Sequence, residues 1–260
     1  MDGLAKEIHD LGLKLGLYGD AGTLTCAGYP GSYGSEQKDA DTLAAWGVDY
    51  WKFDNCLTEK PYTNGGIKSP QYYPIMRDAL LKTGKPILYS ICQWGRDEVW
   101  TWGGKVGNLW RMSPDIQNSW SSVSGIAAKA ATIYQYSGPG GFNDLDMMVR
   151  LHRRRYAQGR LAGSCQLTRD QELGNGRLTE AEERAHFGLW AIMKSPIIMG
   201  TDMSKLKPAT LSIIKNKVPS PPSEVPHLGL TETGHSCHQP GPPGQGSHDI
   251  RTRRPGGTER

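Results

Sequence analysis

The sequence Trp51-Lys52-Phe53-Asp54-Asn55-Cys56 ends an apolar run that begins at Val48, and it places two charged side chains at the end of that run. In a β-strand, residues i and i+2 point to the same face, so Lys52 and Asp54 would lie side by side. A carboxylate at a strand end with a cation beside it is what a barrel enzyme needs to hold an ionised nucleophile at its open face. A solvated strand end is the other interpretation of this hexapeptide.

Short apolar runs of strand length recur along the chain and alternate with segments of helical periodicity. The runs are Leu13–Tyr18, Val48–Phe53, Pro86–Ile91, Asn108–Arg111, Ile133–Tyr136 and Ser195–Met199. The predicted helices are Gln37–Trp46, Tyr72–Lys82, Val123–Ala131 and Glu180–Met193, the last with a possible capping box of Thr179 and Glu182. This alternation predicts parallel βαβ units.

Polar residues follow the end of each predicted strand. They are Asp20, Asp54, Gln93 with Trp94, Asp115, Asp144 with Asp146, and Asp202. Active sites of (β/α) barrels are built in such loops, whereas doubly wound sheets carry a glycine-rich phosphate turn after the first strand. The stretch Gly138–Gly141 lacks the spacing of a phosphate turn and predicts a tight loop. We therefore predict an α/β protein of the barrel type.

Six motifs keep the order and spacing of one enzyme family. They are Leu15-Gly16-Leu17-Tyr18-Gly19-Asp20, Thr25-Cys26-Ala27-Gly28-Tyr29-Pro30-Gly31-Ser32, Trp46-Gly47-Val48-Asp49, Lys52-Phe53-Asp54-Asn55-Cys56, Gly138-Pro139-Gly140-Gly141-Phe142-Asn143-Asp144-Leu145-Asp146-Met147 and Leu189-Trp190-Ala191-Ile192-Met193. Together they resemble the melibiase-type α-galactosidases of the glycoside hydrolases. The resemblance covers roughly Met1 to Met148 and Glu172 to Lys217.

The resemblance implies a retaining glycosidase that works by double displacement without a cofactor or a metal. The family nucleophile falls on Asp54 and the family acid/base on Asp115. The positions of its sugar ligands fall on Tyr18, Lys52, Gln93, Trp94, Arg111 and Asp146. Such an enzyme needs two carboxyls about 5 Å apart, one ionised to attack the anomeric carbon and one protonated to protonate the leaving oxygen.

The charges of these residues agree with their implied roles. Ionised Asp54 would help to keep Asp115 protonated, and Lys52 would favour the ionised form of Asp54. Each assignment has an ordinary structural alternative: Asp115 as a helix N-cap, for example, or Tyr18 as a core aromatic residue. Asp144 is interpreted as a cap or structural carboxylate and is left out of the set. The seven histidines fall outside the strand ends, which disfavours metal-dependent hydrolysis.

The cysteines fit an extracellular protein but do not establish one. The resemblance pairs Cys26 with Cys56 in a disulfide, whereas Cys92 lacks the partner that some relatives have near Gly107, and the total of five leaves an odd thiol. We expect secretion for the intact family member. The N-terminus, Met1–Ala5, does not have the apolar core of a signal peptide, and no stretch of membrane-spanning length is visible.

Two segments depart from the family pattern. Residues 149–171 are interpreted as an aberrant insertion into a partial barrel domain at 1–217, and residues 218–260, with eight of the 17 prolines, as a disordered Pro/Gly-rich tail. The first two strands of the family's (β/α)8 barrel and its C-terminal antiparallel β domain have no counterpart. We expect a barrel truncated to about six strands with two open edges, and hence low stability and little activity.

Basic-residue usage separates these segments from the rest of the chain. Residues 149–177 and 218–260 hold 11 Arg and no Lys, whereas the remainder holds 15 Lys and 4 Arg. Our hypothesis is that residues 149–171 and 218–260 are translated from unspliced intron sequence, and a genuine basic loop that binds an acidic partner is the alternative. Without residues 149–177 the formal net charge of +4 becomes −1, so the basic balance does not indicate a nucleic-acid partner.

Three functions are compatible with these features. The first is hydrolysis of terminal non-reducing α-D-galactosyl residues from oligosaccharides, polysaccharides or glycolipids. The second is an α-N-acetylgalactosaminidase activity on the same scaffold, which a small residue near Gln93 would favour. The third is a carbohydrate-binding remnant without turnover. We expect no membrane partner, and the oligomeric state stays open.

Overall fold

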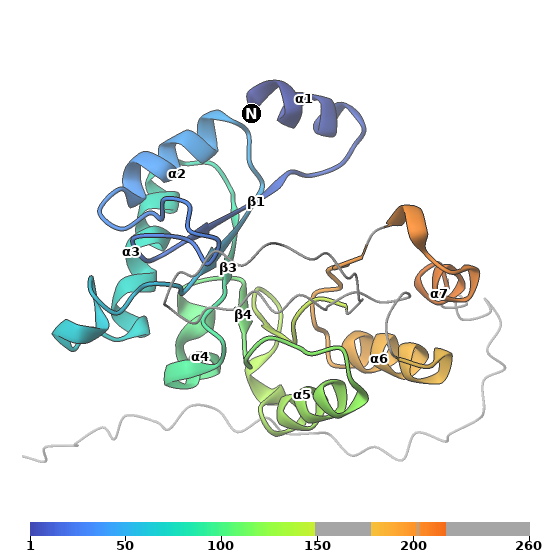
Figure 1. The fold of residues 1–260 in the computed structure, drawn as a ribbon. Helices are drawn as coiled ribbons and strands as arrows, with labels where there is room; N and C mark the ends of the chain where they lie inside the picture. Colours follow the sequence, from blue (N-terminus) through green and yellow to red (C-terminus); the bar gives the residue numbers. More distant parts are fainter. Residues whose placement is uncertain (149–177, 202, 217–260) are drawn as a thin grey trace, which may run out of the picture. The chain divides into compact units, whose positions relative to one another are not determined.

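A parallel β-sheet with helices in its connections forms the centre of the computed structural model, which describes residues 1–148, 178–201 and 203–216 (Figure 1). The strands are β1 (Gly16–Asp20), β2 (Tyr50–Asp54), β3 (Leu88–Ile91), β4 (Leu109–Arg111) and β5 (Phe142–Asp144). They lie in sequence order, each parallel to the next. Successive βαβ units, each adding one strand to the same edge, produce this order.

Helices and short turns make up the connections between and beyond the strands. The α-helices are α1 (Asp2–Asp10), α2 (Glu36–Ala45), α3 (Ser69–Lys82), α4 (Val99–Trp102), α5 (Trp120–Thr132), α6 (Glu180–Ile192) and α7 (Pro208–Ile214). The 3-10 turns are η1 (Thr63–Gly65), η2 (Arg96–Glu98), η3 (Gly103–Lys105), η4 (Tyr134–Tyr136) and η5 (Met203–Lys205). None of the described helices is both long enough and apolar enough to cross a membrane.

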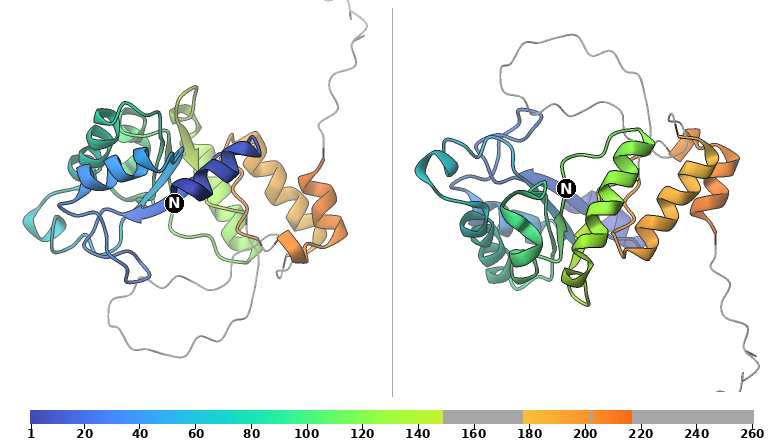
Figure 2. Two further views of the ribbon diagram at one scale, coloured as in Figure 1. Left: turned by 90° about the horizontal axis from the view of Figure 1, so that it is seen from above. Right: turned by 90° about the horizontal axis from the view of Figure 1, so that it is seen from below.

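The strand register divides the side chains between two faces of the sheet. Gly19, Phe53 and Ile91 are neighbours on the face that packs against α2 and α3, two helices that lie side by side (Figures 1 and 2). Phe53 is fully buried there and meets the ring of Tyr73 edge to face at 6.0 Å. Because side chains alternate along a strand, Lys52 and Asp54 point to the opposite face.

A second apolar cluster packs α5 and α6 around Trp190. This side chain is fully buried with Leu145 and Val123, and its indole N–H donates to the carbonyl oxygen of Asp146 at 2.7 Å. The contact joins α6 to the loop after β5, although the two are far apart in the sequence. It therefore holds that loop in place from outside the sheet.

The four predicted helices are present as α2, α3, α5 and α6, within three residues of their predicted bounds at either end. The capping box before α6 is confirmed. The N–H of Thr179 donates to the Glu182 carboxylate at 2.7 Å, and the N–H of Glu182 donates to Thr179 Oγ1 at 3.3 Å. These two bonds satisfy N–H groups that have no partner within the helix, which is why the helix begins here.

One of the six predicted strands is wrong, and another is represented by a single bridge. The run Ile133–Tyr136 ends α5 and forms η4, since Tyr136 N–H donates to the Ile133 carbonyl at 3.2 Å; the fifth strand is Phe142–Asp144. A short apolar, tyrosine-rich run occurs both at the end of a helix and in a strand, so the sequence pattern does not distinguish the two. Among the described residues, the run Ser195–Met199 makes one parallel bridge, between Met148 and Met199, with Met148 N–H donating to the Ile198 carbonyl oxygen at 2.8 Å. The tight loop predicted at Gly138–Gly141 is confirmed by reciprocal backbone hydrogen bonds of 2.9 and 3.0 Å between its end residues.

Three sequence predictions lie outside the described residues. These are the insertion at 149–171, the tail at 218–260 and the strand-end residue Asp202. They stay predictions.

His186 of α6 makes the stability of the fold depend on pH. Its side chain is fully buried against the Trp190 ring, and neither ring nitrogen has a hydrogen-bond partner in the described part of the chain. Burial lowers the pKa of His186 to about 4. Because the unfolded chain, with a pKa near 6.5, binds the proton more tightly, stability is lost as the pH falls from about 6.5 to about 4.

We expect this loss to reach about 3 kcal/mol, and His186→Phe should abolish it. Urea unfolding of both proteins at intervals between pH 4 and pH 7 measures the difference in slope. Equal slopes for the two proteins would contradict the prediction, whatever the absolute stability of the variant.

Candidate active site

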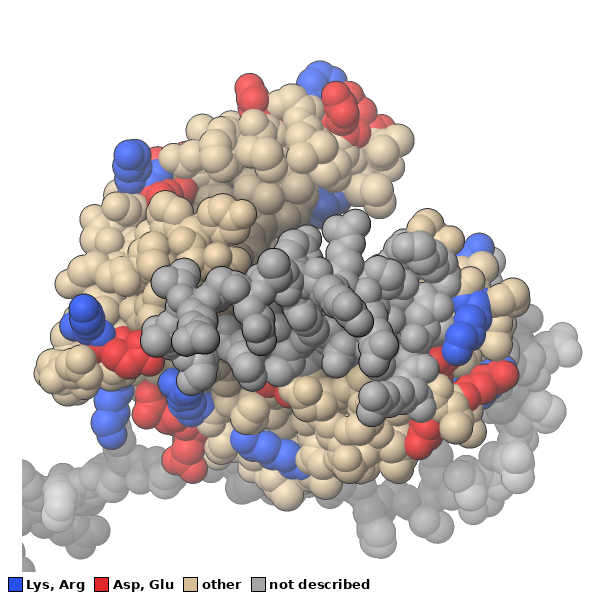
Figure 3. All heavy atoms as spheres, in the orientation of Figure 1, with Lys and Arg blue, Asp and Glu red and all other residues tan. Residues whose placement is uncertain are grey.

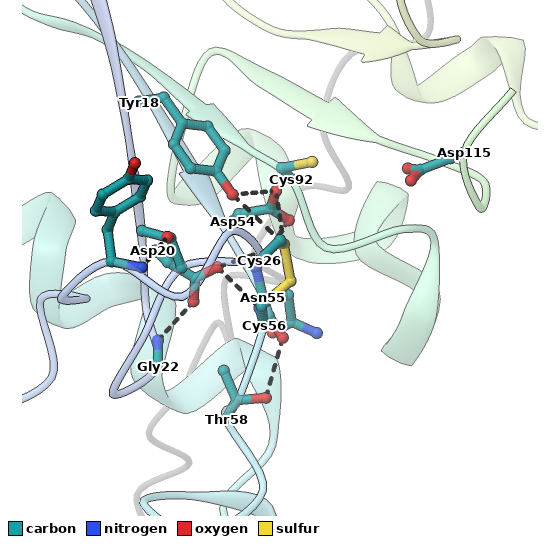
Figure 4. Close-up of a disulfide and its surroundings, with 12 residues drawn as sticks. Tyr18, Asp20, Gly22, Cys26, Asp54, Asn55, Cys56, Thr58, Cys92 and Asp115 are labelled. Atoms are coloured by element: carbon teal, nitrogen blue, oxygen red, sulfur yellow. Dashed lines mark hydrogen bonds between the residues drawn. A yellow bond between two sulfur atoms is a disulfide. The ribbon is translucent and has the colours of Figure 1, made fainter. Parts of the chain in front are cut away.

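Asp54 lies at the carboxyl end of β2 and is almost completely buried. The hydroxyl of Tyr18 donates to its Oδ2 at 2.8 Å, and the N–H of Asn55 donates to its Oδ1 at 2.9 Å (Figure 4). Burial and then the Asp54 charge raise the pKa of Tyr18, so the phenol remains a donor. Each carboxylate oxygen thus has one donor, and the side chain is held in one orientation.

Lys52 supplies a cation to the same face of the sheet. The register pairs Lys52 with Tyr18 on β1 and with Ser90 on β3, two residues before the level of Asp54. The Cys92 side chain, followed by Asp144 and Asp146, raises the pKa of Lys52 against the opposing effects of burial and Arg111. Lys52 is therefore charged at any physiological pH and can donate to a hydroxyl oxygen in the cavity.

Arg111, at the end of β4, is a fully buried cation between two carboxylates. Its Nη2 lies 2.8 Å from Oδ2 of Asp146 and 2.9 Å from Oδ1 of Asp115, and it also donates to the carbonyl oxygen of Ser113 at 3.2 Å. Burial opposes the charge, but Asp146 and the other nearby acids outweigh it and raise the pKa of Arg111. The guanidinium thereby fixes the positions of two candidate residues on different loops.

Asp146 is the most constrained of the candidate residues. Its backbone has a φ of 84°, in the left-handed region that non-glycine residues rarely adopt. The N–H groups of Ile116 and Met147 donate to its carboxylate at 2.8 and 2.7 Å, in addition to the ion pair with Arg111. Backbone strain held in place by several bonds is common at functional sites.

Asp144 holds the loop that carries Asp146. It is buried, accepts a hydrogen bond from the Asp146 N–H at 2.8 Å, and burial raises its pKa. These contacts agree with the interpretation of Asp144 as a structural carboxylate.

These residues enclose a cavity of about 400 Å³ at the carboxyl ends of the strands. The lining residues are Tyr18, Cys26, Ala27, Lys52, Asp54, Cys92, Arg111, Asp115, Asp146 and Met147. Asp115 is partly exposed, with 39% of its side chain accessible, and its carboxylate points toward Asp54 (Figure 4). The cavity is large enough for one sugar ring, and its polar wall offers donors as well as acceptors.

Two predicted ligands lie outside this lining. Gln93 is fully buried and its amide nitrogen donates to Ser69 Oγ at 2.8 Å, while its amide oxygen has no partner among the described residues. Trp94 has a φ of 62°, and the Arg96 guanidinium lies 4.8 Å from its ring centroid. The sugar contacts assigned to these two residues stay predictions.

The predicted disulfide between Cys26 and Cys56 is present and joins the loop after β1 to the loop after β2 (Figure 4). Its Cα atoms are 5.2 Å apart across 30 residues of sequence, and Cys26 Sγ lies 3.5 Å from Oδ2 of Asp54. Cys92 is a buried free thiol in the cavity wall. The disulfide therefore braces the loop that carries the central carboxylate.

Four residues near the cavity were not in the predicted set: Ala27, Cys92, Met147 and Asp20. The first three line the cavity, and Asp20 lies just behind it, opposite Asp54 in the strand register. Asp20 could have been included from the sequence, because it follows a predicted strand as the other candidate carboxylates do. For Cys92 and Met147, no signal beyond adjacency to predicted residues was available in the sequence.

A cavity at the carboxyl ends of parallel strands, walled by carboxylates and two cations, has the position and lining of a (β/α)-barrel active site. Comparisons with known proteins specify the family. The sequence profile described as Alpha galactosidase A matches residues 1–152 and 161–219. Alpha-galactosidase 3 of Arabidopsis thaliana is 44% identical over 214 residues, which cover 82% of this chain and 42% of the relative.

Comparison with solved structures identifies the same family. Alpha-galactosidase I from Mortierella vinacea superposes with a TM-score of 0.69 at 36% identity, over 83% of this chain and 53% of that one. The α-galactosidase of Saccharomyces cerevisiae solved with raffinose has a TM-score of 0.66 at 35% identity, over 82% of this chain and 46% of that one. The chain belongs to the α-galactosidase family of glycoside hydrolases, and it spans about half the length of the curated relatives it matches.

Proposed function

We propose that the chain is a retaining α-galactosidase that releases terminal α-D-galactose from galactosides. The observation that supports this most directly is the pair Asp54 and Asp115 at one cavity, the first buried and held by Tyr18, the second partly exposed and held by Arg111. A nucleophile needs a fixed, ionised carboxylate, whereas a proton donor needs access to the leaving group and to water.

The reaction has two steps. In the first, Asp54 Oδ attacks the anomeric carbon, the bond from that carbon to the leaving oxygen breaks, and Asp115 transfers its proton to this oxygen. In the second, Asp115 takes a proton from water, whose oxygen attacks the anomeric carbon and displaces Asp54. Galactose is released with its α configuration retained, and both carboxyl groups return to their initial protonation states.

The remaining residues of the cavity orient the sugar. Lys52 donates to ring hydroxyls, the Asp146 carboxylate accepts from them, and Arg111 holds Asp146 and Asp115 at a fixed spacing. Raffinose, the ligand of the S. cerevisiae relative, carries a terminal α-galactosyl group, so we propose oligosaccharides of this kind as substrates. Polysaccharides and glycolipids with the same terminal group have the same chemistry at the cleaved bond.

On the face drawn in Figure 3, the Lys, Arg, Asp and Glu side chains of the described residues are interspersed. The disulfide supports secretion as part of the proposal, because such bonds persist in oxidising compartments. Growth-medium and cell fractions assayed separately for this chain in its source cells would test secretion.

The stereochemistry of the first product tests the mechanism. Although we expect the 260-residue chain to have low activity, the galactose that it releases from a nitrophenyl α-galactoside should be the α anomer, detected by proton NMR before mutarotation. The two roles are separated by azide: Asp54→Gly with azide should give β-galactosyl azide, since azide replaces the nucleophile, and Asp115→Gly should give α-galactosyl azide, since azide replaces water. Release of β-galactose would exclude double displacement.

Galactose binding without turnover, measured by calorimetry on the folded chain, would instead favour the carbohydrate-binding remnant. Circular dichroism of the same sample establishes that the chain is folded before this conclusion is drawn.

A further inference from the structure

Asp20, the last residue of β1, forms a buried bridge between two loops of the site. Its side chain is completely inaccessible to solvent. The N–H of Gly22 donates to its Oδ1 at 2.8 Å and the N–H of Cys56 donates to its Oδ2 at 2.9 Å (Figure 4). One carboxylate thus satisfies a backbone donor of its own loop and a backbone donor of the loop that follows Asp54.

The backbones of the two loops are in direct contact around this bridge. The N–H of Ala21 donates to the carbonyl oxygen of Asp54 at 3.0 Å. A Cβ added to Gly22 would lie 2.0 Å from the carbonyl oxygen of Cys56, so only glycine permits this approach. The chain at Asp54 and Cys56 is therefore held from one side by β1 and its loop.

Asp20 also lies close to the Asp54 side chain without reaching the cavity. The two residues are opposite each other in the register, and one carboxylate oxygen of each lies within 4.8 Å of the other. Burial, with a smaller contribution from the Asp54 charge, raises the pKa of Asp20 to about 8 against the effect of its two N–H donors. When two carboxylates are this close, a proton on one leaves the other free to carry the charge.

We propose that Asp20 is the positioning residue of Asp54: its carboxylate bridges the β1 and β2 loops and sets the place from which Asp54 meets the sugar. This inference rests on the proposed function, because it assumes that Asp54 reacts. Asp20 touches neither the cavity nor a substrate placed in it, so it acts through Asp54 and the Cys26–Cys56 loop.

Asp20→Asn is the informative substitution, because it keeps the shape of the side chain and removes one of the two acceptors. The amide NH₂ must then face a backbone N–H, and the bridge is lost at one end. A displacement of a reacting group by about 1 Å costs about 100-fold in rate. We therefore expect kcat on a nitrophenyl α-galactoside to fall about 100-fold while KM changes by less than about twofold, because the sugar ligands are untouched.

Asp49→Asn is the matched control at the other end of the same strand pair. Asp49 precedes β2, accepts from the N–H of Leu15 at 3.0 Å, and lies 2.7 Å from Nε2 of His9, so it too ties β1 to β2 through a carboxylate. A purely structural effect would lower the thermal stability in both variants. We expect only Asp20→Asn to lower kcat at a temperature where circular dichroism shows both to be folded, and equal kcat values for the two variants would overturn the proposal.

A second measurement needs no turnover. Dithiothreitol should reduce the Cys26–Cys56 disulfide about tenfold faster in Asp20→Asn than in the parent chain or Asp49→Asn, since loss of one buried hydrogen bond favours loop opening by about that factor. If the parent chain cleaves no galactoside, the proposed function fails. The rates of disulfide reduction then test whether Asp20 positions the loop. A rate in Asp20→Asn equal to that of the parent chain would refute the proposal.

If Asp20→Asn does not fold, hydrogen exchange on the parent chain gives the answer. The amides of Gly22 and Cys56 should exchange slowly and with the same opening free energy, because one carboxylate holds both. Exchange of the Cys56 amide at the rate of a free loop amide would exclude the bridge.

Discussion

Asp54→Asn should reduce kcat by roughly 10⁴-fold or more, the largest effect that we expect from any single substitution in this chain. Asparagine has nearly the same size as aspartate and can still accept the hydrogen bond from Tyr18, although its NH₂ group then faces the N–H of Asn55 and that one bond is lost. The amide lacks the charge and the nucleophilicity that the first step requires. Initial rates on a nitrophenyl α-galactoside and on raffinose measure the loss.

The control for this experiment is Asp49→Asn, which makes the same chemical change in the same strand pair at the opposite end of β2. It should keep kcat within about twofold. Both variants need the far-ultraviolet dichroism of the parent chain for the comparison to hold. If Asp54→Asn retained a tenth of the parent turnover, Asp54 would not be the nucleophile.

Arg111→Met should destabilise the fold by about 3–5 kcal/mol, the largest stability effect that we expect. The substitution leaves Asp146 buried without its cation, although the N–H groups of Ile116 and Met147 still donate to its carboxylate. The free-energy cost of burying a charge without a partner is larger than the stability that the ion pair itself contributes. Urea unfolding of the parent chain and the variant gives the free-energy difference.

Arg184→Met is the matched control for the buried pair. Arg184 pairs with Glu180 at 2.8 Å, the same distance as the pair of Arg111 and Asp146, but more than half of each side chain is exposed. This change should cost less than about 1 kcal/mol. In the double variant Arg111→Met with Asp146→Asn, the cost should be smaller than the sum of the two single costs, and additive costs would argue against a coupled pair.

The stretch around Asp54 shows how far a local pattern can be interpreted. Its apolar run, its turn residues and the alternation with helices predicted a parallel sheet, and the structure has five parallel strands in sequence order. The placement of Lys52 and Asp54 on one face followed from the two-residue period of a strand alone. Short-range periodicity is a property of the sequence, so these features could be predicted without coordinates.

The wrongly predicted strand shows where the pattern fails. Ile133–Tyr136 has apolar side chains at strand spacing, but the end of α5 uses its backbone groups in a 3-10 turn. Phe142–Asp144 has only three residues and follows a glycine-rich loop, so its periodicity is too short to be recognised. Which of two short segments pairs with β4 depends on the neighbouring strand rather than on either segment.

The sequence alone determined the parallel α/β class, the family and the disulfide pairing, because each depends on periodicity or on motifs that are contiguous in the chain. The tertiary structure decided how those motifs combine. It placed Arg111 between Asp115 and Asp146, put Cys92 in the cavity wall and buried Asp20 between two loops. These relations join residues that are up to 36 positions apart, and only the register of neighbouring strands and the packing of their loops bring such residues within hydrogen-bonding distance.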